Sequence, residues 1–221
     1  MQAASFLPYN APKLTASESQ SRALALEEAL ASRRSVRSFS DKPVAREVID
    51  SLIRTASSAP SGAHKQPWTF CAISDADLKQ QIRTAAEKEE YENYHGRMSE
   101  AWLEDLAPFG TDWNKPFLTI APWLIVVFKR AFEITPDGEK AKNYYVNESV
   151  GLACGFLLTA IHQAGLVSLT HTPSPMNFLH KLLERPANER PFLLIPVGYP
   201  ADDAQVPQLQ RKPLSEVAVF Y

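Results

Sequence analysis

The sequence predicts an α+β fold, in which helices flank a β-sheet, on three observations. Helical and strand-like segments alternate along the 221 residues, but they are short and irregular. Residues 122–130 form an almost continuous apolar run, which is typical of a buried strand. The glycine motifs GxGxxG and GxxxxGKS of nucleotide-binding folds do not occur. These features favour an α+β sheet over a doubly wound parallel sheet.

The N-terminal quarter predicts an arm and two helices. Residues 1–16 are expected to be an extended arm, which a dimer can dock. Residues 17–35 open with serine caps and repeat apolar residues at helical spacing. A second helix is expected over residues 41–56, with Asp41 as its cap and Pro43 in its first turn.

The middle of the chain predicts two strands and two long helices. Residues 68–73 form a strand candidate, and Asp75 is placed to cap a helix that runs into the acidic segment 87–94. The apolar run 122–130 is the second strand. Residues 143–165 are apolar almost all round and end at a glycine, so a central buried helix is expected there.

The last third predicts strands over residues 166–170 and 191–199, separated by a short helix at 176–184. A length of 221 residues and 45% apolar content suit one domain with a sizeable core.

Composition excludes several classes of partner. Lys and Arg number 23 against 25 Asp and Glu, so neither nucleic acid nor an anionic membrane is an expected partner. Cys71 and Cys154 lack CxxC spacing, so no metal site is predicted and buried thiols in a reducing cytoplasm are expected. No signal peptide or membrane span is recognisable, which predicts a soluble cytoplasmic protein.

A basic cluster after the first predicted helix has two interpretations. Arg33, Arg34, Ser35 and Arg37 can surround a phosphate, because arginine forms bidentate bonds and keeps its charge. The same residues can be a solvated helix end that complements the helix dipole. The cluster by itself leaves both open.

Three residues have the chemistry to hold a zwitterionic amino acid. Glu90 and Tyr94 are four residues apart on a predicted helix and share one face, and Lys115 follows after a turn that contains glycine. The carboxylate suits an ammonium, and the lysine and phenol suit a carboxylate. A solvated helix face is the alternative.

Two loops are also candidates. Pro60, Ser61 and Gly62 form either a simple turn or a sharp loop whose backbone approaches a ligand closely. The segment from Thr170 to Thr172 ends a strand just before Pro173, so its hydroxyls either point toward a cofactor or are satisfied locally.

Together these segments resemble the nitroreductase-like flavoprotein family, and most of all its branch that removes halogen from halotyrosines. The resemblance extends from about Ala31 to the end of the segment RKPL at 211–214. Its blocks include RRSVR, APSGAH, QPWTF, APWLIVVFK, THTP, PVGYP and RKPL.

The resemblance implies a nitroreductase-like fold with a mostly antiparallel sheet, in an intertwined homodimer that binds FMN noncovalently at its interface. Residues 1–221 are then a single FMN-binding domain, and Ser61 and Gly62 reach the flavin of the other subunit. The cofactor-binding residues implied by position are Arg33, Arg34, Ser35, Val36, Arg37, Ser61, Gly62, Thr170, His171, Thr172 and Arg211.

The resemblance also implies the substrate site. A lid over about residues 87–115 carries Glu90 for the α-ammonium, with Tyr94 and Lys115 for the α-carboxylate. The amide of Ala63 holds the phenolate, and the catalytic Thr172 bonds flavin N5. His171 departs from a mammalian pattern that has threonine there, so we expect a solvent-facing or backbone-bonded side chain rather than a proton donor.

The implied activity is FMN-dependent reductive dehalogenation of halotyrosines, from 3-iodotyrosine to tyrosine plus iodide, in one-electron steps. The electron donor is expected to be NAD(P)H or a separate reductase. Two alternatives stay open: a broad NAD(P)H-dependent nitroreductase or quinone reductase, and a flavin or amino-acid binding protein without turnover.

Overall fold

The computed structural model describes residues 5–221, and the first four residues of the predicted arm lie outside that range. The chain forms two compact units, which divide after Arg33. In the first unit, residues 5–15 have no regular structure and are exposed, and helix α1 spans Ala16–Ala31. Thr15, rather than the predicted serines, caps α1: its hydroxyl accepts from the Glu18 amide, and the Glu18 carboxylate accepts from the Thr15 amide at 2.7 Å.

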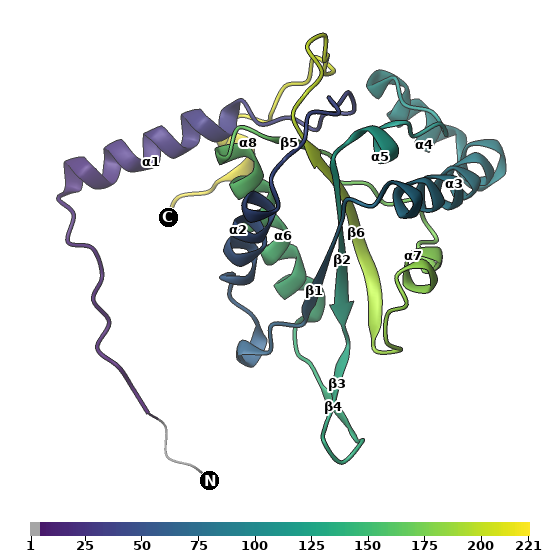
Figure 1. The fold of residues 1–221 in the computed structure, drawn as a ribbon. Helices are drawn as coiled ribbons and strands as arrows, with labels where there is room; N and C mark the ends of the chain where they lie inside the picture. Colours follow the sequence, from purple (N-terminus) through teal and green to yellow (C-terminus); the bar gives the residue numbers. More distant parts are fainter. Residues whose placement is uncertain (1–4) are drawn as a thin grey trace. The chain divides into compact units, whose positions relative to one another are not determined.

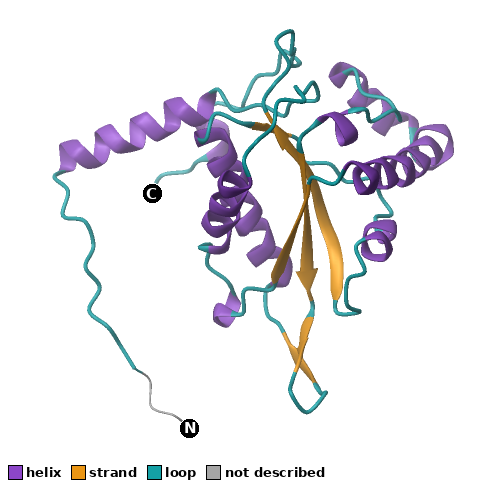
Figure 2. Cartoon of the chain, viewed as in Figure 1, coloured by secondary structure: helices purple, strands orange, loops and turns teal. Residues whose placement is uncertain are grey.

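The second unit is built on a four-stranded sheet in which every pair of neighbouring strands is antiparallel (Figure 2). Its order is β1 (Trp68–Ile73), β2 (Trp123–Arg130), β6 (Glu189–Gly198) and β5 (Val167–Ser168). The predicted α+β class is therefore confirmed. A separate hairpin, β3 (Phe132–Ile134) with β4 (Lys140–Lys142), was not predicted.

Strand β2 explains the continuous apolar run in the sequence. Leu124, Val126 and Phe128 contribute to one buried cluster, whereas Ile125 and Val127 contribute to the other. Alternate side chains of a strand point to opposite faces, so a strand covered on both faces is apolar at every position. Antiparallel pairing does not prevent this, because helices cover both faces.

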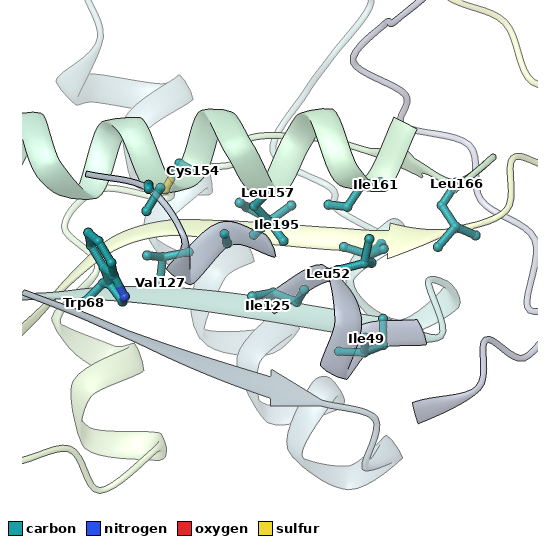
Figure 3. Packing of buried hydrophobic residues seen from close by; sticks show 14 of the residues in the cluster. Ile49, Leu52, Trp68, Ile125, Val127, Cys154, Leu157, Ile161, Leu166 and Ile195 are labelled. Atoms are coloured by element: carbon teal, nitrogen blue, oxygen red, sulfur yellow. The ribbon is translucent and has the colours of Figure 1, made fainter. Parts of the chain in front are cut away.

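Within the second unit, helices cover both faces of the sheet (Figure 1). Helices α2 (Arg46–Ser57) and α6 (Val146–Gln163) cover one face, where Ile49 and Leu157 pack near Ile125 and Ile195 (Figure 3). The opposite face is covered by α3 (Ala76–Glu92), α5 (Phe117–Ile120) and α7 (Asn177–Leu182).

Three sequence predictions about these helices have different outcomes. Asp75 caps α3 as predicted, with its carboxylate accepting from the Leu78 amide at 2.7 Å. The cap of α2 is Ala45 and makes no side-chain hydrogen bond, so the prediction for Asp41 was wrong: the helix begins several residues later. Helix α6 is only partly buried in this chain, because Leu152 and Phe156 are 49% and 40% exposed.

The C-terminal segment adds one short helix, α8 (Leu214–Val217). Over residues 5–221, no helix is both long and apolar enough to span a membrane.

Candidate active site

Two adjacent cavities collect most of the predicted site residues. The smaller, of about 190 Å³, is lined by seven of them: Arg37, Glu90, Tyr94, Lys115, Thr170, His171 and Thr172. The larger, of about 390 Å³, is lined by Ser35 and Arg37 together with residues of two other loops. Because Arg37 lines both, a ligand in one cavity lies next to a ligand in the other.

Glu90 and Tyr94 reach the smaller cavity from the end of α3. The helix continues directly into a π-helical turn, η2 (Asn93–Arg97), so the two side chains stay on one face as their spacing predicted. The Asn93 amide side chain donates to the Ser174 carbonyl at 2.8 Å and fastens this turn to the loop after β5. The Tyr94 hydroxyl donates to the Thr111 carbonyl at 3.2 Å.

The segment between η2 and α5 forms an apolar wall of the cavity. It contains α4 (Glu100–Leu106) and a single turn, η3 (Ala107–Phe109), which ends at Gly110 with φ of 56°. Met98, Trp102 and Leu106 all line the cavity. Sequence reasoning did not assign these residues to the site, although the four-residue spacing of Trp102 and Leu106 on α4 is the signal of one helical face.

Lys115 is buried and held by several hydrogen bonds. Its backbone amide donates to the Glu87 carboxylate at 2.8 Å, and the same oxygen accepts from Arg83 at 2.7 Å. The Lys115 ammonium donates to the Thr111 hydroxyl at 3.2 Å and to the Asp112 carbonyl. These contacts bring the ammonium to 3.7 Å from Oε2 of Glu90.

The buried side chains give the cavity a definite charge. Burial raises the pKa of Glu90, and the neighbouring Lys115 opposes that rise. Burial lowers the pKa of Lys115 and of Arg37, and it raises the pKa of Tyr94, which keeps the phenol neutral. Counted by their formal charges, two positive for Arg37 and Lys115 and one negative for Glu90, the lining side chains sum to one positive charge.

In the segment after β5, alternate side chains differ in their exposure to solvent. Thr170 and Thr172 are exposed and line the cavity, whereas His171 is only 7% exposed. The His171 backbone exchanges two hydrogen bonds with Leu194, at 2.9 and 3.0 Å. These bonds join backbone to backbone, so they do not test the expected bond from the His171 side chain to a backbone group. The alternative of a solvent-facing side chain was wrong, because this side chain is buried.

The basic segment is fixed mainly through its backbone. Ser35 forms a bridge with Ser168, the Val36 amide donates to the Ser168 carbonyl at 3.1 Å, and Val36 is buried. The Arg34 guanidinium donates to the Pro207 carbonyl. Arg37 lies 5.7 Å from the centre of the Phe109 ring, so the wall segment covers it.

Three of the predicted arginines, Arg33, Arg34 and Arg211, do not line these cavities in the described part of the chain. Arg33 ends the first unit, where its amide donates to the Leu30 carbonyl at 3.1 Å. Arg211 lies in an exposed segment after β6.

The loop from Ser61 to Ala63 lies far from the basic segment of the same chain. The loop leads to Pro67, whose carbonyl accepts from Arg130 at the end of β2. Ser35 bridges Ser168, which pairs with Val197 and so aligns with Trp123 at the start of β2. Seven residue steps of strand separate these ends, roughly 23 Å, and Figure 1 shows the two segments at opposite ends of the sheet.

Gly62 has a packing role within the chain. A Cβ at this position would lie 2.8 Å from the Tyr144 carbonyl oxygen, so only glycine fits. The Gly62 amide donates to the Ser149 hydroxyl of α6 at 3.2 Å. The adjacent Ala63 has φ of 49°, which is uncommon for alanine and turns the chain sharply.

A comparison of the chain with models of protein families agrees with the fold and with the two neighbouring cavities. The model of the nitroreductase family matches residues 30–199. The chain therefore belongs to the nitroreductase family.

Comparisons with individual proteins show where in this family the chain belongs. The chain is 61% identical over 220 residues to an iodotyrosine deiodinase of Haliscomenobacter hydrossis, covering 100% of this chain and 99% of the relative. It is 45% identical to iodotyrosine deiodinase 1 of Homo sapiens, over 96% of this chain and 74% of the relative. A crystal structure of oxidised iodotyrosine deiodinase bound to FMN and 3-iodo-L-tyrosine matches with a TM-score of 0.75 and 32% identity, covering 88% of this chain and 100% of the other. Within the nitroreductase family, the chain is thus grouped with the iodotyrosine deiodinases.

Proposed function

We propose that this protein is an FMN-dependent iodotyrosine deiodinase. The reaction converts 3-iodotyrosine, two electrons and one proton into tyrosine and iodide. One observation carries the proposal: Glu90, Tyr94 and Lys115 line one cavity that shares Arg37 with a second, larger cavity. An amino-acid site beside a cofactor site is the arrangement that this reaction requires.

The residues around the larger cavity fit a flavin phosphate and ring. The Arg34–Arg37 segment supplies charge, and its backbone is held against Ser168. Thr170 and Thr172 are exposed into the neighbouring cavity, so Thr172 can donate to flavin N5. When bound, FMN supplies the electrons for reductive removal of the halogen.

The remaining flavin contacts come from a second copy of the chain. Ser61, Gly62 and Ala63 lie at the opposite end of β2 from the Arg34–Arg37 segment, so one chain does not bring both to one flavin. A homodimer in which each copy presents this loop to the other copy's cofactor resolves the separation. The exposed apolar residues Leu152 and Phe156 on α6 suit such an interface.

Charge and shape select the substrate. Glu90 receives the α-ammonium, Lys115 and Tyr94 receive the α-carboxylate, and the Ala63 amide donates to the phenolate. A halotyrosine with an ionised phenol carries one net negative charge, which matches the one net positive charge of the cavity. The wall of Met98, Trp102 and Leu106 excludes water from the bound ring.

The electrons reach the flavin from NAD(P)H or from a separate reductase. The free thiols of Cys71 and Cys154 suit a reducing compartment, so we assign the protein to the cytoplasm.

An anaerobic single-turnover experiment tests the function. The FMN-loaded protein is reduced chemically, 3-iodo-L-tyrosine is added, and flavin absorbance and free iodide are measured together. We expect one iodide for each flavin reoxidised, and no reoxidation with L-tyrosine as the control. Reoxidation by nitroaromatic compounds without iodide release from iodotyrosine would instead identify a nitroreductase. Binding of iodotyrosine without any turnover would identify a binding protein.

A further inference from the structure

One buried nitrogen in the cavity lacks a hydrogen-bond partner. Among the described residues, the buried side-chain atoms without a partner are Arg130 Nε, Asn143 Oδ1 and His171 Nε2. Of these three residues, His171 alone lines the described cavities. A buried polar atom without a partner costs free energy, so an unpartnered nitrogen of a residue that lines a ligand cavity indicates a bond that a ligand completes.

The His171 ring is fixed in place. Its backbone is paired on both sides with Leu194, and its ring packs edge-on against buried Phe117, with centroids 5.5 Å apart and planes at 89°. His171 lines the cavity, and its Nε2, itself shielded from solvent, is held beside Glu90 Oε1 by the sheet and α5.

The two oxygens of Glu90 face different groups. Oε2 lies 3.7 Å from the Lys115 ammonium, and Oε1 lies 3.9 Å from His171 Nε2. Both distances are too long for a hydrogen bond. Lys115 already donates to Thr111 and Asp112, so the space between Oε1 and Nε2 is where another donor can enter.

We propose that His171 is a further substrate-binding residue, whose Nε2 accepts one N–H of a primary ammonium group while Glu90 Oε1 accepts another. The proposal rests on the proposed function, in which this ammonium is the α-amino group of a halotyrosine. A separation of 3.9 Å suits two acceptors that each lie about 2.8–3.0 Å from one nitrogen.

The electrostatics of the site suit an acceptor. Burial, together with the positive charges of Lys115 and Arg37, lowers the pKa of His171 to about 3. The imidazole is therefore neutral, and with its proton on Nδ1 it presents a lone pair at Nε2. A neutral imidazole does not form an ion pair with Glu90, so the carboxylate remains available to the ammonium group of the ligand.

The consequence is selectivity for the amino group. Glu90 alone attracts any cation, whereas two fixed acceptors require a group with two N–H donors in one place. Removing the His171 acceptor should weaken the binding of a ligand that has the ammonium group and leave the binding of a ligand without it nearly unchanged.

The test compares two ligands and two variants of the FMN-loaded protein. His171→Phe keeps a ring beside Phe117 but removes the nitrogen, and His171→Gln keeps a polar atom that can accept. The ligands are 3-iodo-L-tyrosine and its desamino analogue, 3-(3-iodo-4-hydroxyphenyl)propanoate, and dissociation constants come from quenching of flavin fluorescence. We expect His171→Phe to weaken iodotyrosine about 3- to 10-fold and the desamino analogue less than about 2-fold, with His171→Gln between parent and Phe.

Three results would overturn the inference. Equal loss for both ligands would make His171 a structural residue, and unchanged iodotyrosine binding would leave it no role. If His171→Phe does not fold, the ratio of the two dissociation constants in His171→Leu decides in the same way. A parent protein that binds neither ligand would refute both the proposed function and this inference. A variant that still binds, with the same ratio of the two dissociation constants as the parent, would refute only the inference.

Discussion

Two buried carboxylates of this protein, Glu189 and Glu90, differ in how their charge is satisfied. Glu189 is 3% exposed and accepts from Arg185 at 2.7 and 3.2 Å and from the Thr69 hydroxyl at 2.6 Å. Glu90 is 6% exposed, but its neighbours, the Lys115 ammonium and the neutral His171 ring, stay at 3.7 and 3.9 Å. The two carboxylates are thus similarly buried, but Glu189 has a complete set of hydrogen bonds and Glu90 has an incomplete one.

The pKa shifts follow this difference. Burial alone would raise the pKa of Glu189, but the hydrogen bonds from Arg185 and Thr69 bring it below its ordinary value. At Glu90, burial dominates and the pKa is raised. A satisfied buried carboxylate stabilises the fold, whereas an incompletely satisfied one keeps its binding capacity for a ligand. The comparison therefore supports the proposed role of Glu90 in ligand binding and a structural role for Glu189.

The largest expected effect is on ligand binding by Glu90→Gln. The substitution removes a charge-assisted bond worth about 1.5–3 kcal/mol, so the dissociation constant of 3-iodo-L-tyrosine should rise roughly 10- to 150-fold. The free energy of unfolding should not fall at neutral pH, because burial raises the pKa of Glu90 despite its neighbour Lys115, so folding disfavours the ionised carboxylate. Fluorescence titration and urea unfolding measure the two quantities. Glu104→Gln, an exposed position on α4, is the control and should change neither. Unchanged binding in Glu90→Gln would refute the functional assignment of this acid.

Glu189→Gln should show the reverse behaviour. Loss of the charge weakens the bonds from Arg185 and Thr69, which should lower the free energy of unfolding by about 2 kcal/mol. Iodotyrosine affinity should stay that of the parent, because Glu189 lines neither cavity. Urea unfolding of both proteins checks the stability. A variant as stable as the parent would show that the Arg185 contact contributes little.

The smallest effect is a pH dependence of opposite sign at the two sites. The ordinary pKa of both carboxyls is 4.5. The stability of the parent relative to Glu90→Gln should fall as pH rises from 4.5 through the raised pKa, because the folded protein holds that proton more tightly. The stability of the parent relative to Glu189→Gln should be constant above pH 4.5. It should fall as pH decreases from 4.5 through the lowered pKa of Glu189. Each slope is at most about 1.4 kcal/mol per pH unit. Urea unfolding is measured from well below pH 4.5 up to neutral pH, and slopes of the same sign for the two carboxyls would contradict the comparison.

Local patterns in the sequence determined several features correctly. The apolar run at 122–130 predicted β2, and Asp75 predicted the start of α3, because strand burial and helix capping depend on neighbouring residues. The four-residue spacing of Glu90 and Tyr94 predicted a shared face, which holds because α3 continues into η2. The sequence blocks around these elements also indicated the nitroreductase family, which the comparisons confirm.

Only the tertiary structure decided which of these groups meet. The burial of His171 depends on its pairing with Leu194 and on Phe117, which are distant in sequence. The separation of Gly62 from the Arg34–Arg37 segment depends on strand order and register, which no local pattern contains. Contacts between distant segments arise from the packing of the whole core, so sequence alone predicted the chemical groups of the site and the structure determined their partners.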